Sequence, residues 1–269
     1  LGVTTAIVCL VLLLRGQPRI IEASNKLIEQ AGGNLVSRLD QQLAGIQGEA
    51  VSMARLAEVL PHDVSLWQNS FPQMIDSNGN HTIAGGGIWP EPDAFVAGTA
   101  LRSFFWAREE SGKLAYSDGY NQPATGDYHK ESWYTQARNA PRDRCTWSDV
   151  YQDQVSGVKM VTCSVPYYAG DRFAGVATLD VMLDNLAQFV KTQGNVTGGY
   201  ALAADKTGTL LYYPGVDTKV LNTLSIVAQK ESWMQPVVSK LKSLGPDATL
   251  ARVDRINDAH LNQSEIGRA

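Results

Sequence analysis

The sequence predicts a mixed α/β (α+β) fold in which a long N-terminal helix precedes two modules of unequal size. Three observations support this prediction. Apolar residues recur every three or four positions over residues 20–60, which is the period of a helix. After Pro61 the chain changes to short strands and glycine-containing turns. Its best strand pair, residues 146–162 and 172–183, flanks a tight turn and indicates a central antiparallel sheet. A second, shorter unit starts near Gly198.

The predicted helix, residues 15–60, is long for a globular protein. About 40 helical residues at ~1.5 Å each would reach ~60 Å, and Pro61 ends the run because proline cannot continue a helix. The apolar positions form one stripe, as they do in coiled coils: Leu35, Leu39, Leu43, Ile46, Ala50, Met53, Ala57 and Leu60. We interpret the helix as a stalk. The stripe predicts either a second copy packed along it, giving a homodimer, or packing against the chain's own domain.

Residues 1–14 form an uncharged apolar run that stops at Arg15. The run is too short to cross a bilayer, which takes roughly 20 residues. No small-residue cleavage site follows it, as a signal peptide would require. We therefore interpret it as the end of a truncated transmembrane helix; a buried helix of a soluble protein is the alternative.

The remaining chain divides into residues 61–190 and residues 191–269. In the second unit, Tyr200–Ala204 and Thr209–Tyr213 flank a glycine-containing turn and predict a hairpin. Helical character follows over residues 221–244, and the tail lacks a clear set of strands. This unit is therefore predicted to be a smaller and incomplete version of the first.

Composition and motifs argue against several classes of function. The 269 residues carry a net charge of −4, and no segment gathers the basic stripe of a nucleic-acid-binding protein. The four histidines are scattered without metal-ligand spacing. The nucleophile motif Gly-x-Ser-x-Gly is absent from the sequence. We therefore predict no enzymatic activity, no cofactor and no metal site.

Cys145 and Cys163 are the cysteines available for a disulfide, because Cys9 lies in the apolar run. If the segments around them form a hairpin in which paired positions sum to 308, the two cysteines lie opposite each other, within disulfide reach. Two small buried thiols are the alternative. In this register Tyr151 and Asp153 share the face of Cys145, because side chains alternate along a strand.

Asp180 stands out in an otherwise apolar strand. The next hairpin turns at residues 170–171, and extending its pairing sets Val161 opposite Asp180. Asp180 then shares the face of Tyr151 and Asp153. A carboxylate in such a strand is costly unless it is paired or faces a cavity; a hydrogen bond to a neighbouring loop is the alternative. Aromatic rings beside carboxylates suit a small organic cation.

These residues resemble those of the extracytoplasmic double Cache domains of bacterial transmembrane receptors, which include methyl-accepting chemotaxis receptors, sensor kinases and diguanylate cyclases. Amino-acid-sensing members carry the motif Tyr-x-x-Arg-x-Trp-Tyr, followed by a Tyr, an Asp and a later Asp. Residues 128–134, Tyr-His-Lys-Glu-Ser-Trp-Tyr, fit this spacing except at one position, and Tyr151, Asp153 and Asp180 fit the later places. The resemblance implies a membrane-distal PAS-like module at 61–190 that holds the ligand and a membrane-proximal PAS-like module at 191–269.

The departure lies at Glu131, where the family motif has arginine. In that family the arginine holds the ligand's carboxylate, while the tyrosine and aspartates hold its amine. Glutamate repels a carboxylate, so the resemblance implies a ligand with an amine and no α-carboxylate, such as a polyamine or a biogenic amine. Lys130 offers a substitute positive charge, which keeps an amino acid as an alternative.

The predicted ligand-binding residues are Tyr128, Glu131, Trp133, Tyr134, Tyr151, Asp153, Asp180 and Trp106. Each of them also has an ordinary explanation, such as core packing for the aromatic side chains or solvation for Glu131. Taken together, they predict the periplasmic ligand-binding domain of an inner-membrane signalling receptor of the chemotaxis type. A structural, membrane-anchored domain without a small ligand is the alternative from another class.

Overall fold

The structure is a computed structural model that describes residues 17–76, 82–194, 201–204, 208–214, 223–230, 235, 238 and 239. The predicted membrane segment, residues 1–14, and most of the predicted second module lie outside the described residues. Among the described helices, none is both long and apolar enough to cross a membrane.

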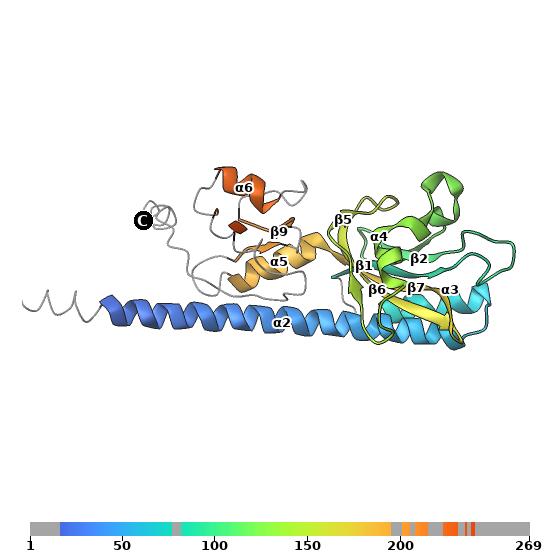
Figure 1. Cartoon of the computed structure of the whole chain (residues 1–269), viewed down its shortest axis with the longest axis horizontal. Helices are drawn as coiled ribbons and strands as arrows, with labels where there is room; N and C mark the ends of the chain where they lie inside the picture. The colour runs from blue at the N-terminus through green and yellow to red at the C-terminus, as the bar shows by residue number, and fades with distance from the viewer. Residues whose placement is uncertain are drawn as a thin grey trace, which may run out of the picture.

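A single helix, α2 (Gln17–Val59), runs for 43 residues along the molecule (Figure 1), which confirms the predicted long helix. The C-terminal part of its apolar stripe, Ile46, Ala50, Met53 and Ala57, is buried. There α2 packs against the long strands of the sheet. Own-domain packing therefore accounts for this part of the stripe. A shorter helix, α3 (Val64–Ile75), follows and is capped by Asp63, whose carboxylate accepts the backbone N–H of Leu66 at 2.7 Å.

Seven antiparallel strands form the central sheet, in the order β3-β2-β1-β7-β6-β4, with β5 also paired to β6. Their bounds are β1 (Ile83–Pro90), β2 (Phe104–Arg108), β3 (Leu114–Ser117), β4 (Thr146–Trp147), β5 (Tyr151–Gln152), β6 (Lys159–Ala169) and β7 (Arg172–Met182). This arrangement confirms the predicted mixed fold with a central antiparallel sheet.

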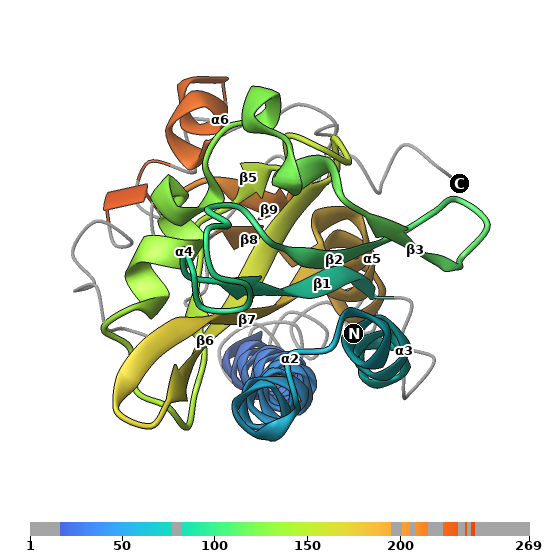
Figure 2. The same cartoon turned by 90° about the vertical axis from the view of Figure 1, so that its right-hand side faces the viewer.

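The sheet has two differently covered faces. Helices α2 and α3 lie against one face, and the short helix α4 (Ser132–Ala137) lies on the other with three 3-10 turns, η2 (Gly119–Asn121), η3 (Pro123–Thr125) and η4 (Tyr128–Lys130), as Figure 2 shows. A hydrophobic core that includes Trp67, Phe104 and Leu179 fills the helix side. A separate aromatic cluster fills the other side.

The observed registers correct both predicted ones. Tyr151 pairs with Met160, and Trp147, not Cys145, pairs with Cys163. In the next hairpin Ala169 pairs with Arg172 as predicted, but a bulge then moves the pairing by one residue, so that Asp180 lies opposite Thr162 instead of Val161. An odd shift turns a side chain to the other face. The predicted register set Tyr151 opposite Gly157, so its partner moves by three residues, and the partner of Asp180 moves by one. Both of these shifts are odd, so Tyr151 and Asp180 still meet on one face.

The bulge lies in β7 just before Gly175, which pairs with Pro90 at the end of β1, and its extra residue is Ala174. Gly175 follows with φ of +151°. A Cβ atom there would lie 2.3 Å from the carbonyl oxygen of Trp89 and 2.6 Å from the ring of Tyr167. Only glycine permits this close approach of β1 and β7.

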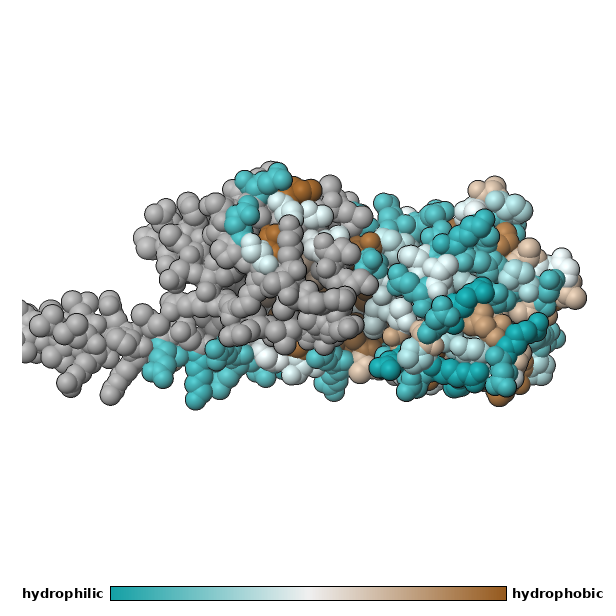
Figure 3. Space-filling model, viewed as in Figure 1, coloured by the Kyte–Doolittle hydropathy of each residue, from teal (hydrophilic) through white to brown (hydrophobic). Residues whose placement is uncertain are grey.

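After the sheet, α5 (Leu183–Gly194) leads to a two-stranded pair, β8 (Ala203–Ala204) and β9 (Leu210–Tyr212), against which α5 packs, and to α6 (Leu224–Lys230). Leu210, Val227 and Val238 form a small core here. The pairing matches the hairpin predicted for this part of the chain; the module boundaries at 190/191 stay a prediction. On the face seen in Figure 3, hydrophilic residues dominate the surface around the sheet.

Candidate functional site

The candidate site lies on the sheet face that carries α4. Its centre is the aromatic cluster around Trp89 of β1, whose indole N–H donates to the Thr178 hydroxyl at 2.8 Å. Four further rings lie with their centroids 4.8–5.4 Å from that of Trp89: Phe105, Tyr120, Tyr128 and Trp133. Trp89 thus anchors this group of aromatic rings to the sheet.

Asp180 of β7 is 3% exposed and lies in the floor of the site. The Thr162 hydroxyl donates to its carboxylate at 2.8 Å. That hydroxyl has one hydrogen, so the Tyr151 hydroxyl donates to it in turn, at 2.7 Å. Burial raises the pKa of Asp180 to about 7; the Thr162 hydrogen bond opposes this, and the nearby charge of Asp153 adds to it.

Asp153, which is 5% exposed, follows β5 and is held by three donors. The Tyr120 hydroxyl donates to Oδ1 in a short hydrogen bond. The Ser156 N–H and hydroxyl donate to Oδ2 at 2.6 and 2.7 Å. These bonds fix the turn after β5 against the 3-10 segment that carries Tyr120.

Glu131 immediately precedes α4 and adds a third carboxylate to the group. Its Oε1 accepts from the Gln154 side chain at 3.2 Å. Burial and the charge of Asp153 raise its pKa. Among the residues that the structure describes, no lysine, arginine or histidine forms an ion pair with Glu131, Asp153 or Asp180. The site therefore presents negative charge without an internal counter-ion.

Tyr120 is the site residue that sequence reasoning missed. It is 6% exposed, and burial together with the charges of Asp153, Asp180 and Glu131 raises its pKa. Its phenol therefore lies near all three carboxylates. The residue sits in an irregular turn with no periodic pattern, and its partner Asp153 comes 33 residues later, so no local pattern indicated it.

Some predicted site residues direct their polar atoms elsewhere. The Tyr128 hydroxyl donates to the carbonyl oxygen of Pro90 at 2.7 Å, and that of Tyr134 donates to Glu91 at 2.7 Å. Both rings still pack in the aromatic cluster, as does Trp133. Trp106 is not brought to the site, because its side chain lies in the core on the helix side of the sheet.

Lys130, the alternative carboxylate partner, lies at the surface. Its side chain is 82% exposed, and its Nζ lies 3.4 Å from Asp127. In this conformation it adds no positive charge to the carboxylate group.

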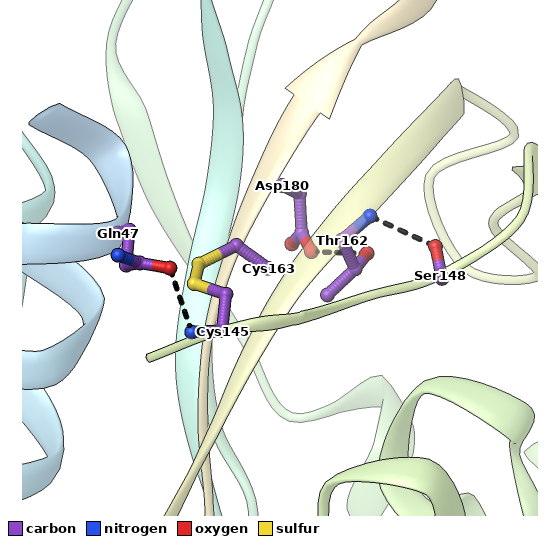
Figure 4. Close-up of a disulfide and its surroundings, with 6 residues drawn as sticks. All are labelled: Gln47, Cys145, Ser148, Thr162, Cys163 and Asp180. Atoms are coloured by element: carbon purple, nitrogen blue, oxygen red, sulfur yellow. Dashed lines mark hydrogen bonds between the residues drawn. A yellow bond between two sulfur atoms is a disulfide. The ribbon is translucent and has the colours of Figure 1, made fainter. Parts of the chain in front are cut away.

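A disulfide joins Cys145 and Cys163 across 18 residues, with a Cα–Cα distance of 5.2 Å, which confirms the predicted pair. The Cys145 N–H also donates to Gln47 of α2 at 3.1 Å, and the Thr162 N–H donates to Ser148 at 2.9 Å (Figure 4). These contacts hold the β4 segment between α2 and the strand that carries Thr162. The disulfide therefore stabilises, from the helix side of the sheet, the part of β6 that carries Thr162.

In the described parts of the chain, no group of three or more histidine, cysteine, aspartate or glutamate side chains is placed so that it could hold a metal ion. A phenol, an indole and carboxylates are instead the groups that bind organic cations.

Residues 72–188 match a family model described as methyl-accepting chemotaxis protein-like, first PDC sensor domain. The chain is 25% identical over 252 residues to the methyl-accepting chemotaxis protein McpC of Bacillus subtilis, an alignment that covers 89% of this chain and 35% of McpC. The chain thus spans about a third of the length of this relative.

Solved structures show the same fold. The extracellular domain of the putative histidine kinase soHK1S-Z6 superposes with a TM-score of 0.59 at 20% identity, covering 81% of this chain and 84% of that one. The ligand-binding domain of the Pseudomonas aeruginosa amino acid chemoreceptor PctC, in complex with GABA, superposes with a TM-score of 0.52 at 22% identity, covering 77% and 82%. The described chain therefore has the fold of the Cache-like extracellular sensor domains of chemoreceptors and histidine kinases, and residues 72–188 match the first PDC sensor domain of methyl-accepting chemotaxis protein-like receptors.

Proposed function

We propose that this chain is the periplasmic sensor domain of a bacterial chemotaxis-type receptor and that its sheet module binds a small cationic amine. The observation that carries the proposal is the group of three carboxylates, Glu131, Asp153 and Asp180, beside aromatic rings and without an ion-pairing cation among the described residues. The similarity to chemoreceptor sensor domains supports the sensor role.

The physical argument rests on the cost of burying charge. A buried carboxylate without a partner is destabilising, and a cation that binds beside it recovers the lost electrostatic stabilisation. Asp180 has one hydroxyl donor and a raised pKa, so it has the most to gain from an ammonium group. The faces of the neighbouring rings attract the same group through their quadrupoles.

Glu131 is expected to determine which charged group the ligand carries at its other end. A ligand that carries a carboxylate toward Glu131 meets a like charge, whereas a second ammonium meets an opposite one. We therefore expect a diamine to bind more tightly than the amino acid with the same carbon chain. In the intact receptor we expect α2 to lead toward the membrane, and exposed residues in its N-terminal half, such as Leu27, offer a surface for a homodimer.

Isothermal titration of the chain with 1,4-diaminobutane and with 4-aminobutanoate tests the proposal, because the two ligands share a four-carbon chain and differ in one charged end. We expect the diamine to bind at least about tenfold more tightly, a difference of about 1.4 kcal/mol. Glu131→Arg should reverse the preference, since arginine pairs with a carboxylate. Equal binding of both ligands, or no binding of any amine, would contradict the proposed specificity.

An amino acid is the second candidate ligand. The observation in its favour is Lys130, which is next to Glu131 in sequence and whose exposed side chain makes a 3.4 Å contact with Asp127. A rotation of this side chain would bring a positive charge toward the ligand's carboxylate. In that case 4-aminobutanoate or an α-amino acid would bind more tightly than the diamine, and Lys130→Ala would remove the difference.

A further inference from the structure

We propose that Tyr120 binds the ligand's ammonium group through its phenolic oxygen and that Asp153 acts on the ligand through this hydroxyl instead of touching it. The inference rests on the proposed amine-binding function and adds a specificity-determining residue to it. It also gives the two buried aspartates different roles, whereas the motif assigns the ligand's amine to both of them.

The hydrogen bonds of the two aspartates differ. Asp153 accepts three, one from Tyr120 on Oδ1 and two from Ser156 on Oδ2. Each carboxylate oxygen has two lone-pair directions, so the Oδ2 atom is fully used. Within the described parts of the chain, Asp180 accepts one hydrogen bond, from Thr162. Asp180 therefore has free acceptor sites for an ammonium group, and most of those of Asp153 are occupied.

The Tyr120 hydroxyl is left with acceptor capacity. Its hydrogen goes to Asp153, and no described residue donates a hydrogen bond to its oxygen. A hydroxyl that donates to a carboxylate becomes a better acceptor, because hydrogen bonds in a chain polarise one another. The hydrogen bond to Asp153 thus makes the Tyr120 oxygen more negative, so that it attracts a ligand ammonium group more strongly. The charges of Asp180 and Glu131 also act on this phenol, which indicates that both carboxylates lie near it.

The ring of Tyr120 is held in position by its neighbours. It makes edge-to-face contacts with Trp89 at 5.0 Å and with Phe105 at 5.6 Å, measured between ring centroids. These contacts, with the bond to Asp153, fix the direction of the phenolic oxygen before a ligand arrives. A fixed acceptor costs the complex less conformational entropy than a mobile one.

A double-mutant cycle tests the inference, with 1,4-diaminobutane as the probe and isothermal titration as the measurement. Tyr120→Phe removes the hydroxyl and keeps the ring. Asp153→Asn keeps an acceptor for Ser156 but directs its amide N–H at the phenolic oxygen, which turns the hydroxyl's hydrogen toward the ligand. Each change should weaken binding about tenfold to a hundredfold, the usual cost of a hydrogen bond to a charged group. Because both act through one hydroxyl, the double variant should bind no more weakly than the weaker single variant.

Tyr116→Phe serves as the matched control, since Tyr116 lies on the edge strand β3, is 37% exposed and contacts Trp106 on the other side of the sheet. It should leave the affinity unchanged. If Asp153 contacts the ammonium itself and Tyr120 only packs, Tyr120→Phe will bind like the wild type and the inference fails. In that case the amine-binding proposal survives. If the wild-type chain binds no amine, both fail together.

A crystal structure of the wild-type chain with 1,4-diaminobutane gives a second test that does not depend on how well a variant folds. An ammonium nitrogen should lie within about 3.2 Å of the Tyr120 oxygen and have no direct contact with Asp153. A direct contact with Asp153 that bypasses Tyr120 would overturn the inference.

Discussion

Replacement of Asp180 by asparagine should make the ligand-free domain more stable at neutral and alkaline pH. Burial raises the pKa of Asp180 from 3.8 to about 7. A shift of about three pKa units corresponds to about 4 kcal/mol of penalty for the ionised form. The asparagine side chain has the same shape and still accepts the hydroxyl of Thr162, but it carries no charge. The Asp180→Asn variant is therefore expected to escape most of this penalty.

The sign and the pH window follow from proton binding. Between about pH 4 and pH 7 the folded state holds a proton on Asp180 that the unfolded state has released, so the stability of the wild type falls as the pH rises. The difference in free energy of unfolding between Asp180→Asn and wild type should grow by about 1.4 kcal/mol per pH unit over this window. It should then level off above pH 7 at about 4 kcal/mol.

Urea unfolding at several pH values, followed by tryptophan fluorescence, measures this difference. Five of the six tryptophans lie in or around the sheet, so the signal reports on the domain that contains Asp180. Asp171→Asn, at the exposed tip of the β6–β7 hairpin, is the matched control and should give a profile parallel to that of wild type. The same Asp180→Asn variant should lose diamine binding. A stability difference that stays flat from pH 4 to pH 8 would refute the assignment of a buried, uncompensated carboxylate.

Three further outcomes follow from the packing. Gly175→Ala should lower the free energy of unfolding by more than about 2 kcal/mol, because the added methyl group would overlap a backbone carbonyl. Gly98→Ala, where φ is positive but the space is open, should lower it by only about 1 kcal/mol. Equal losses would argue against the close approach of β1 and β7. Joint replacement of Cys145 and Cys163 by alanine should lower the free energy of unfolding by about 3 kcal/mol in non-reducing urea titrations, and an unchanged midpoint would mean that the disulfide does not brace the sheet. Trp106→Phe should lower the melting temperature and leave the affinity for 1,4-diaminobutane intact; weaker binding would place this ring at the site after all.

The parts of the fold that the sequence predicts are those governed by local periodicity. The stripe from Leu35 to Leu60 specifies a helix because each step of three or four residues returns to the same side, independent of the rest of the chain. The tight turn at Gly170 fixes the start of the β6–β7 hairpin for the same reason, and its first pair, Ala169 with Arg172, is observed. Local chemistry is sufficient for both.

The candidate site depends on contacts that no local pattern records. A bulge at Ala174 shifts the pairing of β6 with β7, so the predicted partner of Asp180 was off by one residue. Phe104 and Trp106 lie on one face of their strand, which was predictable because side chains alternate along a strand. Which face meets the helices was not, because that depends on where α2 docks. Tyr120 escaped notice for a similar reason, since its importance comes from a distant carboxylate.

The extra residue at Ala174 also separates two regions of the β6–β7 hairpin that respond differently to changes in chain length. Register at Asp180 is fixed by pairing with β1 and with the inner part of β6, beyond the bulge from the turn. A residue gained or lost in the exposed turn at Gly170 and Asp171 leaves this pairing in place. The same change between Gly175 and Asp180 would turn the carboxylate into the helix-side core. The hairpin tip is therefore a suitable place for inserted sequence such as a reporter peptide, and the segment after it is not.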